Sequence, residues 1–299
     1  MNKLTTKRLH RHKLQSGVLG LALHPDNGMA YAACIDGVYE LDVESGESRR
    51  LYEHQSYASN VVYIHERNQI VSSGYDGALQ WYDLDTDSVI RHIQAHQFWS
   101  WDLARAPEAP IIASSTGQYL AGDYEYRPRP SDEPCVRVYH AITGELLSSH
   151  VHGPPAQCVG LDPSGTHVAA GNLMGDVGVW RVGEDNGEVA RWNTPDFTAF
   201  GIIKSHCQIG GLYAIAFAPD AKELIVAGMG PMRDPMAGNG KQRWQRFAWT
   251  GDKPVKVSQS NDGQVGEGLM ETLAVHPGGQ HFVMAGRLRG GSWSAGLFD

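Results

Sequence analysis

An internal repeat constrains the fold of this chain more than any other feature of its sequence. A short apolar strand, a two-residue turn, a second strand, a Gly/Asp turn and a third strand ending near an aromatic residue recur six times. The turns after the first strands are His24-Pro25, His65-Glu66, Ala106-Pro107, Asp162-Pro163, Ala218-Pro219 and His276-Pro277. Counted on the second residue, their spacings are 41, 41, 56, 56 and 58. A period near 41 with insertions is typical of a four-stranded unit.

The strands of each unit alternate in the way that half-buried strands do. First strands, such as Val18–Leu23, consist of small and apolar residues, and second strands, such as Met29–Cys34, continue the apolar pattern. No segment has the periodicity of an amphipathic helix. Because each unit exposes an apolar face that only a neighbouring unit can cover, the repeats must stack on one another. The pattern predicts an all-β protein.

The second unit carries the clearest sequence motif. It reads VSSGYDGALQWYD over residues 71–83, after His54. This unit resembles a WD40 repeat, and the resemblance extends from about residue 14 to the end of the chain. In that family a His, a Ser/Thr, an Asp and a Trp form a hydrogen-bonded tetrad, and here the matching residues are His54, Ser72, Asp76 and Tyr82. The other units are degenerate, and unit four has Met174 at the Asp position.

The resemblance implies one β-propeller of four-stranded antiparallel blades over residues 1–299. Six blades are counted, and seven, the usual number in the family, stays open. The repeats cover about 16–55, 56–97, 98–153, 154–209, 210–266 and 267–299. The last unit shows three strands, so we expect residues 1–15 to form a strand that pairs with it and closes the ring. Such pairing would remove an exposed sheet edge.

Composition excludes several classes of protein. Hydrophobic residues make up 41% of the chain and charged residues 19%, which permits a sizeable core. The net charge of −8 argues against general binding to nucleic acid. No apolar run approaches the roughly 20 residues that cross a bilayer, and no secretory signal is recognisable. The four cysteines contain no CxxC pair, so we expect reduced thiols. Together with the missing apolar run and secretory signal, this predicts a cytoplasmic protein that binds no membrane.

The insertions point to one face. In the resembled fold, turns between second and third strands open on the same face as the links between blades, and the insertions at 116–134, 228–242 and 286–291 fall in such turns. Aromatic and arginine side chains dominate interface hot spots. The candidate partner-binding residues are therefore Trp99, Trp101, Tyr124, Tyr126, Arg127, Arg129, Arg233, Arg287 and Arg289. The alternative for Trp99 and Trp101 is packing between blades.

The sequence predicts a non-catalytic scaffold that binds a peptide or protein. The innermost strands are mostly apolar, with Asp102 and Glu271 as exceptions, and no nucleophile elbow, phosphate loop or zinc motif occurs. His10/His12 and His150/His152 lack a third ligand nearby, so we predict neither metal nor cofactor. A channel-mouth hydrolase acting on a small molecule remains the alternative, and recognition of an acidic ligand by the arginines is a third possibility.

Overall fold

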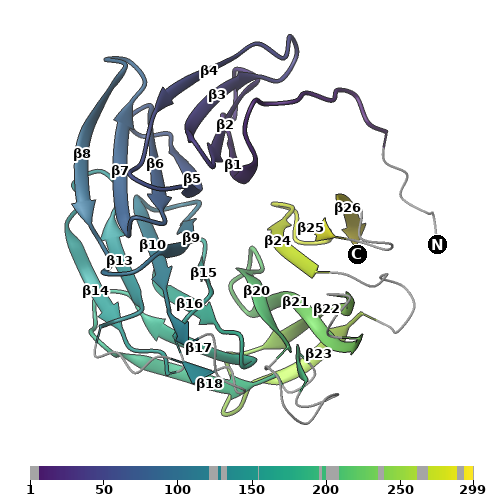
Figure 1. Ribbon diagram of the computed structural model, residues 1–299. Coiled ribbons are helices and arrows are strands. Elements are labelled where there is room, and N and C mark those ends of the chain that lie inside the picture. Colours follow the sequence, from purple (N-terminus) through teal and green to yellow (C-terminus); the bar gives the residue numbers. More distant parts are fainter. Residues whose placement is uncertain are drawn as a thin grey trace.

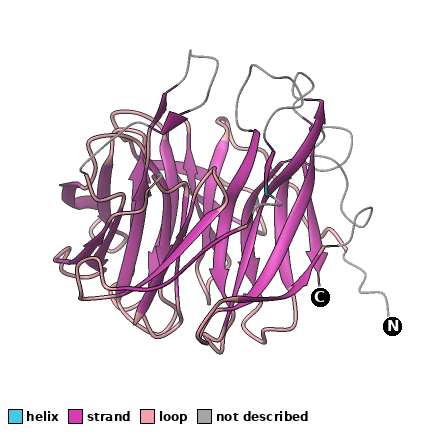
Figure 2. Ribbon diagram, turned by 90° about the horizontal axis from the view of Figure 1, so that it is seen from below, coloured by secondary structure: helices cyan, strands magenta, loops and turns pink. Residues whose placement is uncertain are grey.

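Six antiparallel sheets stand around a common axis in the computed structural model (Figure 1). The structure describes residues 7–120, 127–128, 133–153, 155–194, 197–199, 209–234, 239–260, 269–287 and 293–298. No α-helix occurs in these ranges. The strands run from one face of the disc to the other (Figure 2). The chain is thus an all-β propeller with six blades, as its repeat predicts.

The first three blades follow the repeat closely. Blade 1 contains β1 (Val18–Leu23), β2 (Met29–Cys34), β3 (Gly37–Asp42) and β4 (Ser48–Tyr52). Blade 2 contains β5 (Ala58–Ile64), β6 (Gln69–Gly74), β7 (Ala78–Asp83) and β8 (Ser88–Gln94). Blade 3 contains β9 (Ser100–Arg105), β10 (Ile111–Thr116), β13 (Val136–His140) and β14 (Leu146–His150). Its insertion adds a separate hairpin of β11 (Tyr119–Leu120) and β12 (Arg127–Pro128).

The last three blades vary more. Blade 4 contains β15 (Cys158–Leu161), β16 (His167–Gly171), β17 (Asp176–Arg181) and β18 (Glu188–Asn193). Blade 5 contains β20 (Ile209–Phe217), β21 (Glu223–Asp234), β22 (Asn239–Ala248) and β23 (Val255–Gln259), with β19 (Thr198–Ala199) added beside β20. Blade 6 contains β24 (Leu269–Val275), β25 (Phe282–Arg287) and β26 (Trp293–Phe298). Each first strand lies innermost, next to the channel.

The core lies between the blades rather than within any one of them. The middle strands are buried on both faces, as in β6, where every residue is buried. Trp81 is fully buried among residues of blades 2 and 3, and its indole N–H donates to the Ala141 carbonyl of blade 3 at 2.5 Å. Because each blade covers its neighbour's apolar face, no sheet has a core of its own.

The predicted closing strand is wrong in the part of it that the structure describes. Residues 7–15 form no strand, and the sheet of blade 6 shows three strands. Leu14 packs instead against a buried cluster on blade 1, and His12 Nε2 lies 2.7 Å from the Val43 carbonyl oxygen. These contacts hold residues 7–15 against blade 1, so the segment does not pair with β26.

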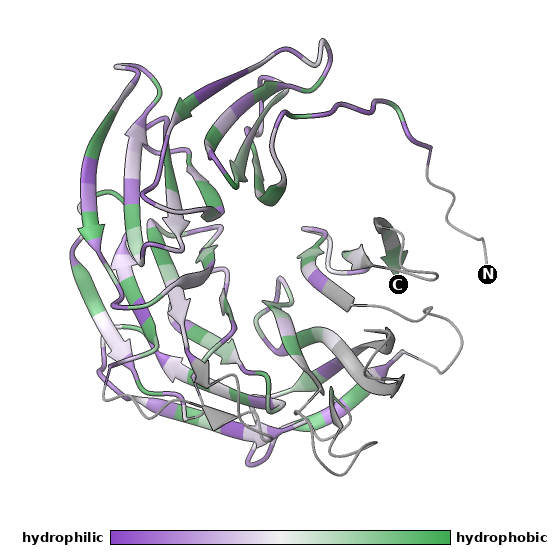
Figure 3. Ribbon diagram, in the orientation of Figure 1, coloured by the Kyte–Doolittle hydropathy of each residue, from purple (hydrophilic) through white to green (hydrophobic). Residues whose placement is uncertain are grey.

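In the described part of the chain, the ribbons of blade 6 and blade 1 stand apart, and we call this separation the opening (Figure 1). Neighbouring innermost strands contact one another from β1 to β24, but β24 and β1 make no comparable contact. The strand β1 is largely hydrophobic (Figure 3), and Leu21 and Leu23 on it are 57% and 63% exposed. On the other side of the opening, Val283 and Leu297 of blade 6 are also exposed and border an apolar hollow.

Candidate functional site

A β-bulge near the start of the innermost strand recurs in five blades. One residue of the strand is skipped in the pairing register, opposite the last residues of the second strand. The skipped residues are Leu19, Ser59, Trp101, Tyr213 and Glu271. Bulges bend a strand and re-aim a side chain, and they are common beside functional sites. Because the second strand ends there, all five bulges lie at the face where the second-to-third-strand turns and the interblade links meet.

Five aromatic side chains gather on this face between blades 2 and 3, and we call them the aromatic cluster. Its members are Tyr57, Tyr75, Phe98, Trp99 and Trp101. The rings of Tyr75 and Trp99 stack with centroids 4.6 Å apart at 9°, and those of Phe98 and Trp99 at 5.1 Å and 10°. Trp101 meets Trp99 edge-on at 5.2 Å, and Tyr57 lies 5.8 Å from Tyr75.

Backbone hydrogen bonds hold the cluster in place. The Tyr75 N–H donates to the Tyr57 carbonyl at 2.8 Å, which ties the β6–β7 turn to the link before β5. The Thr116 hydroxyl donates to the Trp99 carbonyl, and the Trp101 indole N–H donates to the Gly117 carbonyl at 2.7 Å. Tyr57 is nevertheless 45% exposed and Trp99 40% exposed. The cluster is therefore a fixed aromatic surface in contact with solvent.

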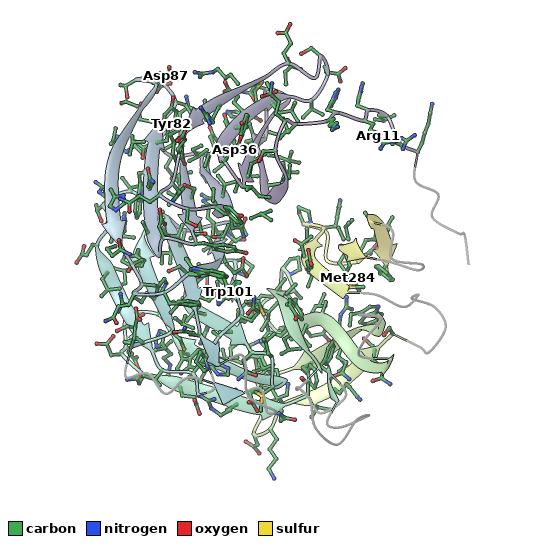
Figure 4. The ribbon with its side chains drawn as sticks, in the orientation of Figure 1. Arg11, Asp36, Tyr82, Asp87, Trp101 and Met284 are labelled. Carbon is green, nitrogen blue, oxygen red and sulfur yellow. The ribbon has the colours of Figure 1, made fainter. Side chains whose placement is uncertain are left out.

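The sequence prediction located part of this surface. Trp99 and Trp101 belong to it, and Trp99 packs against Tyr75 of the neighbouring blade while 40% of its surface stays exposed. Figure 4 shows Trp101 on the channel side of the ring. Tyr57, Tyr75 and Phe98 were missed. The repeat register offered a signal for Tyr57, because it stands two residues before the bulge of blade 2 as Trp99 does in blade 3.

The other candidate residues lie largely outside what the structure describes. Arg127, Arg233 and Arg287 lie on strands β12, β21 and β25, and only their backbone is described. The four remaining candidates fall outside the described residues: Tyr124, Tyr126, Arg129 and Arg289. Their part in binding stays a prediction.

Beneath the aromatic cluster lies the hydrogen-bonded network of blade 2. His54 Nδ1 lies 3.1 Å from the Asp76 carboxylate, and its Nε2 lies 2.7 Å from the Ser72 hydroxyl. Burial opposes ionisation of Asp76, but the hydrogen bond and charge of His54 and two backbone N–H groups lower the pKa of its carboxyl below the ordinary value. The network fixes the turn that carries Tyr75.

The resemblance to a WD40 repeat predicted Tyr82 as the fourth member of this network, and this prediction is wrong. The Tyr52 hydroxyl donates to Ser72 at 2.8 Å, whereas the Tyr82 hydroxyl donates to Asp87 at 2.5 Å near the outer edge of the blade (Figure 4). The rings of Tyr52 and Tyr82 stack at 5.0 Å. Tyr52 ends β4 of blade 1, so its hydroxyl joins the network across the blade boundary.

Blades 3 and 4 contain partial versions of the same network. His96 Nε2 lies 2.8 Å from the Ser114 hydroxyl in blade 3. In blade 4 the Asn172 amide donates to the Asp176 carboxylate at 3.2 Å. The sequence comparison had put Met174 at the position of the acidic residue, but Asp176 supplies the carboxylate from two residues later. Degenerate repeats thus keep the polar contacts with shifted residues.

Asp102, a candidate general base of the hydrolase alternative, has its carboxylate occupied by structural contacts. Its Oδ1 accepts from the Asn60 amide of blade 2 at 2.8 Å and from the Leu103 N–H at 2.9 Å. Its Oδ2 accepts from the Val159 N–H of blade 4 at 3.0 Å. Burial raises the pKa of Asp102, against the lowering effect of these hydrogen bonds. The carboxylate joins the innermost strands of three blades.

The described residues show no other kind of site. Within the described ranges, no three His, Cys, Asp or Glu side chains come together as a metal site would need. No helix in those ranges could cross a membrane. Comparison with protein-family models and with curated proteins finds no match for the chain.

Proposed function

We propose that this propeller is a non-catalytic scaffold that binds a peptide or protein segment through the face carrying the aromatic cluster. The observation that carries the proposal is a preformed, partly exposed cluster of five aromatic side chains on that face, three of which are stacked. Aromatic side chains supply large contact area with little loss of side-chain entropy, and they are enriched among interface hot spots. Because hydrogen bonds already fix the cluster, binding costs little further ordering.

The sequence resemblance and the cysteines support two further parts of the proposal. The six-fold repeat and the His54–Ser72–Asp76 network support a WD40-like origin of the blades. Cys34, Cys135 and Cys158 are free and buried, which supports a reducing, cytoplasmic setting. We further propose that the arginines of the insertions extend the same binding surface; they are Arg127, Arg129, Arg233, Arg287 and Arg289.

The test is quantitative affinity capture with three forms of the protein. The first is wild type, the second is Tyr57→Ala/Trp99→Ala, and the third is a control, Val89→Ala/Ile90→Ala, which removes similarly exposed apolar side chains from the outer strand β8. We expect the same proteins to be enriched by wild type and control and depleted at least about tenfold with the aromatic variant. Equal recovery by all three forms would overturn the choice of this face.

A further inference from the structure

The face of blade 6 that points away from blade 5 is apolar and exposed. Phe282 and Met284 of β25 are buried in a cluster with residues of blade 5. Because successive side chains of a strand point to opposite faces of the sheet, Val283 points the other way. In the pairing register Val283 stands between Ala274 of β24 and Leu297 of β26, so these side chains form a row across the sheet. The row borders the apolar hollow, which has a volume of about 280 Å³.

The innermost strand of blade 1 presents a second apolar surface at the opening. Gly20 and Ala22 of β1 face blade 2, since a Cβ on Gly20 would lie 2.7 Å from the Asn60 Cα and Ala22 packs on the cluster between blades 1 and 2. The alternate side chains, Leu21 and Leu23, point the other way and are exposed. In blade 4, by contrast, every residue of the innermost strand β15 is buried. Both borders of the opening therefore expose apolar side chains of a kind that the other blades bury against a neighbour.

A basic segment lies beside the exposed border of blade 1. It is residues 7–13, which read KRLHRHK, and we call it the basic arm. The residue that follows it, Leu14, packs on Ala32 and Cys34 of β2, on the sheet face opposite the one that contacts blade 2. The arm therefore lies on the side of blade 1 that borders the opening (Figure 1), and Arg11 stands on it outside the sheet of blade 1 (Figure 4).

The cations of the basic arm have no partner in the part of the chain that the structure describes. All four side chains are exposed and form neither an ion pair nor a hydrogen bond with the described residues: Lys7, Arg8, Arg11 and Lys13. The carboxylate of Glu44 approaches the arm at His10, 3.7 Å from its Nε2. Leu9, between these cations, is 76% exposed. The arm thus adds concentrated positive charge beside an apolar border, on a chain whose net charge is −8.

We propose that the opening binds a segment of a partner protein that is apolar on one face and acidic on another. The apolar side chains of that segment cover Leu21 and Leu23 of β1 and Val283 of blade 6, as neighbouring blades cover one another elsewhere in the ring. Its carboxylates pair with Arg8 and Arg11 of the basic arm, because a guanidinium binds a carboxylate through two hydrogen bonds. The opposite charges steer the segment to the opening and fix its register there. The aromatic cluster lies between blades 2 and 3, so this surface is separate from it and the inference goes beyond the proposed function.

The chemistry of the opening selects this occupant over two others. A second copy of the chain, bound through the same surface in a two-fold contact, would place the cations of one arm against those of the other. The phosphates of a nucleic acid would neutralise the arm but leave the leucine and valine side chains in water. An acidic segment with an apolar face satisfies both the charge and the apolar borders.

A library of random dodecapeptides displayed on phage tests the inference. The library is first depleted on the variant Leu21→Ser/Leu23→Ser, which removes peptides that bind elsewhere, and is then selected on the wild-type protein. We expect the recovered peptides to combine carboxylates with leucine, isoleucine, valine or phenylalanine. Fluorescence anisotropy of the synthetic peptides should show about tenfold weaker binding to Arg8→Glu/Arg11→Glu/Lys13→Glu than to wild type, and weaker binding to wild type at high salt.

Matched variants separate this surface from the rest of the molecule. Arg67→Glu/Lys222→Glu/Lys253→Glu reverses three exposed charges away from the arm and should leave the affinity within about twofold of wild type. Val283→Ser on blade 6 should weaken binding of the same peptides. Val257→Ser, which replaces a similarly exposed valine on the outer strand β23, should not. Melting curves verify that each variant is folded.

Several results would overturn the inference. Recovered peptides without carboxylates, or an affinity that the triple charge reversal in the arm does not alter, would do so. Recovery of no peptide above background would also do so, because the two borders would then cover each other in solution. A dimer that dissociates in Leu21→Ser/Leu23→Ser would assign the borders to a second copy, and a labelled oligonucleotide that needs the arm but not the leucines would assign the arm to nucleic acid. Peptides that lose binding in Tyr57→Ala/Trp99→Ala would occupy the aromatic cluster, which would support the proposed function alone.

Discussion

Replacement of Asp102 tests whether its carboxylate is structural. The side chain accepts from Asn60 of blade 2 and from Val159 of blade 4, in addition to its own neighbour Leu103. Asp102→Ala leaves the Leu103 and Val159 N–H groups without this acceptor, whereas the Asn60 amide still donates to the Leu103 carbonyl at 3.1 Å. The site lies where the innermost strands of blades 2, 3 and 4 pack together. Asp102→Asn keeps one acceptor oxygen, but its amide nitrogen is a donor and cannot accept the hydrogen bond that the other carboxylate oxygen accepted.

The expected losses follow from the number of donors left unpaired. An unsatisfied buried donor costs about 1–3 kcal/mol. Asp102→Ala leaves two such donors, so its cost is about 2–6 kcal/mol, and Asp102→Asn, with one, costs about 1–3 kcal/mol. At roughly 2 °C per kcal/mol for a chain of this size, the melting temperature should fall by about 4–12 °C and 2–6 °C.

Differential scanning fluorimetry measures both losses, with Asp252→Asn as the control. Asp252 is an exposed carboxylate in the turn before β23, and its replacement should leave the melting temperature within about 1 °C of wild type. The expected order is wild type and control, then Asp102→Asn, then Asp102→Ala. A melting temperature for Asp102→Ala that equals wild type would refute the structural role and reopen the general-base hypothesis.

Three more predictions concern buried groups. Burial lowers the pKa of His150 from 6.5 to about 4, so the neutral side chain stabilises the fold fully above pH 6.5 and less as the pH falls toward 4. Urea titrations should show that the free energy of unfolding falls by about 2–3 kcal/mol over this range because of His150, and this part of the fall should be absent in His150→Phe. Tyr52→Phe should destabilise the fold by about 1 kcal/mol and Tyr82→Phe by less, and the reverse order in urea unfolding would contradict the network described for blade 2. In a Cys207→Ser variant, the three remaining thiols should not react with Ellman's reagent before unfolding, since burial raises the pKa of Cys34 to about 11; fast labelling of the native protein would show exposed thiols.

The fold followed from the sequence because its signal is repeated. The strand Val18–Leu23 and the strand Met29–Cys34 were predicted with their observed bounds. Turn spacing and strand alternation act together in each unit, so degeneration of one unit did not hide the period. The prediction of the closing strand was wrong because the basic segment of residues 7–15 has no periodicity that specifies its partner. Contacts of Leu14 and His12 with blade 1 fix its position instead.

The site was harder to predict because it is assembled across repeats. Trp99 and Trp101 attracted attention as a pair, but Tyr57 and Tyr75 join them only through the register of the bulges and the turn fixed by Asp76. Tyr52 enters the network of blade 2 from the preceding blade, and a motif read within one unit assigns that place to Tyr82. Contacts between blades are not written in the spacing of any single repeat.

Neighbouring repeats bring their aromatic residues together on one face of the propeller. The most direct measurement is a nuclear Overhauser spectrum of protein with labelled tyrosine and tryptophan, assigned with Tyr75→Phe and Trp99→Phe variants. Stacked rings with centroids 4.6 Å apart predict strong cross-peaks between Tyr75 of blade 2 and Trp99 of the link to blade 3. Absence of those cross-peaks in the folded protein would contradict the account.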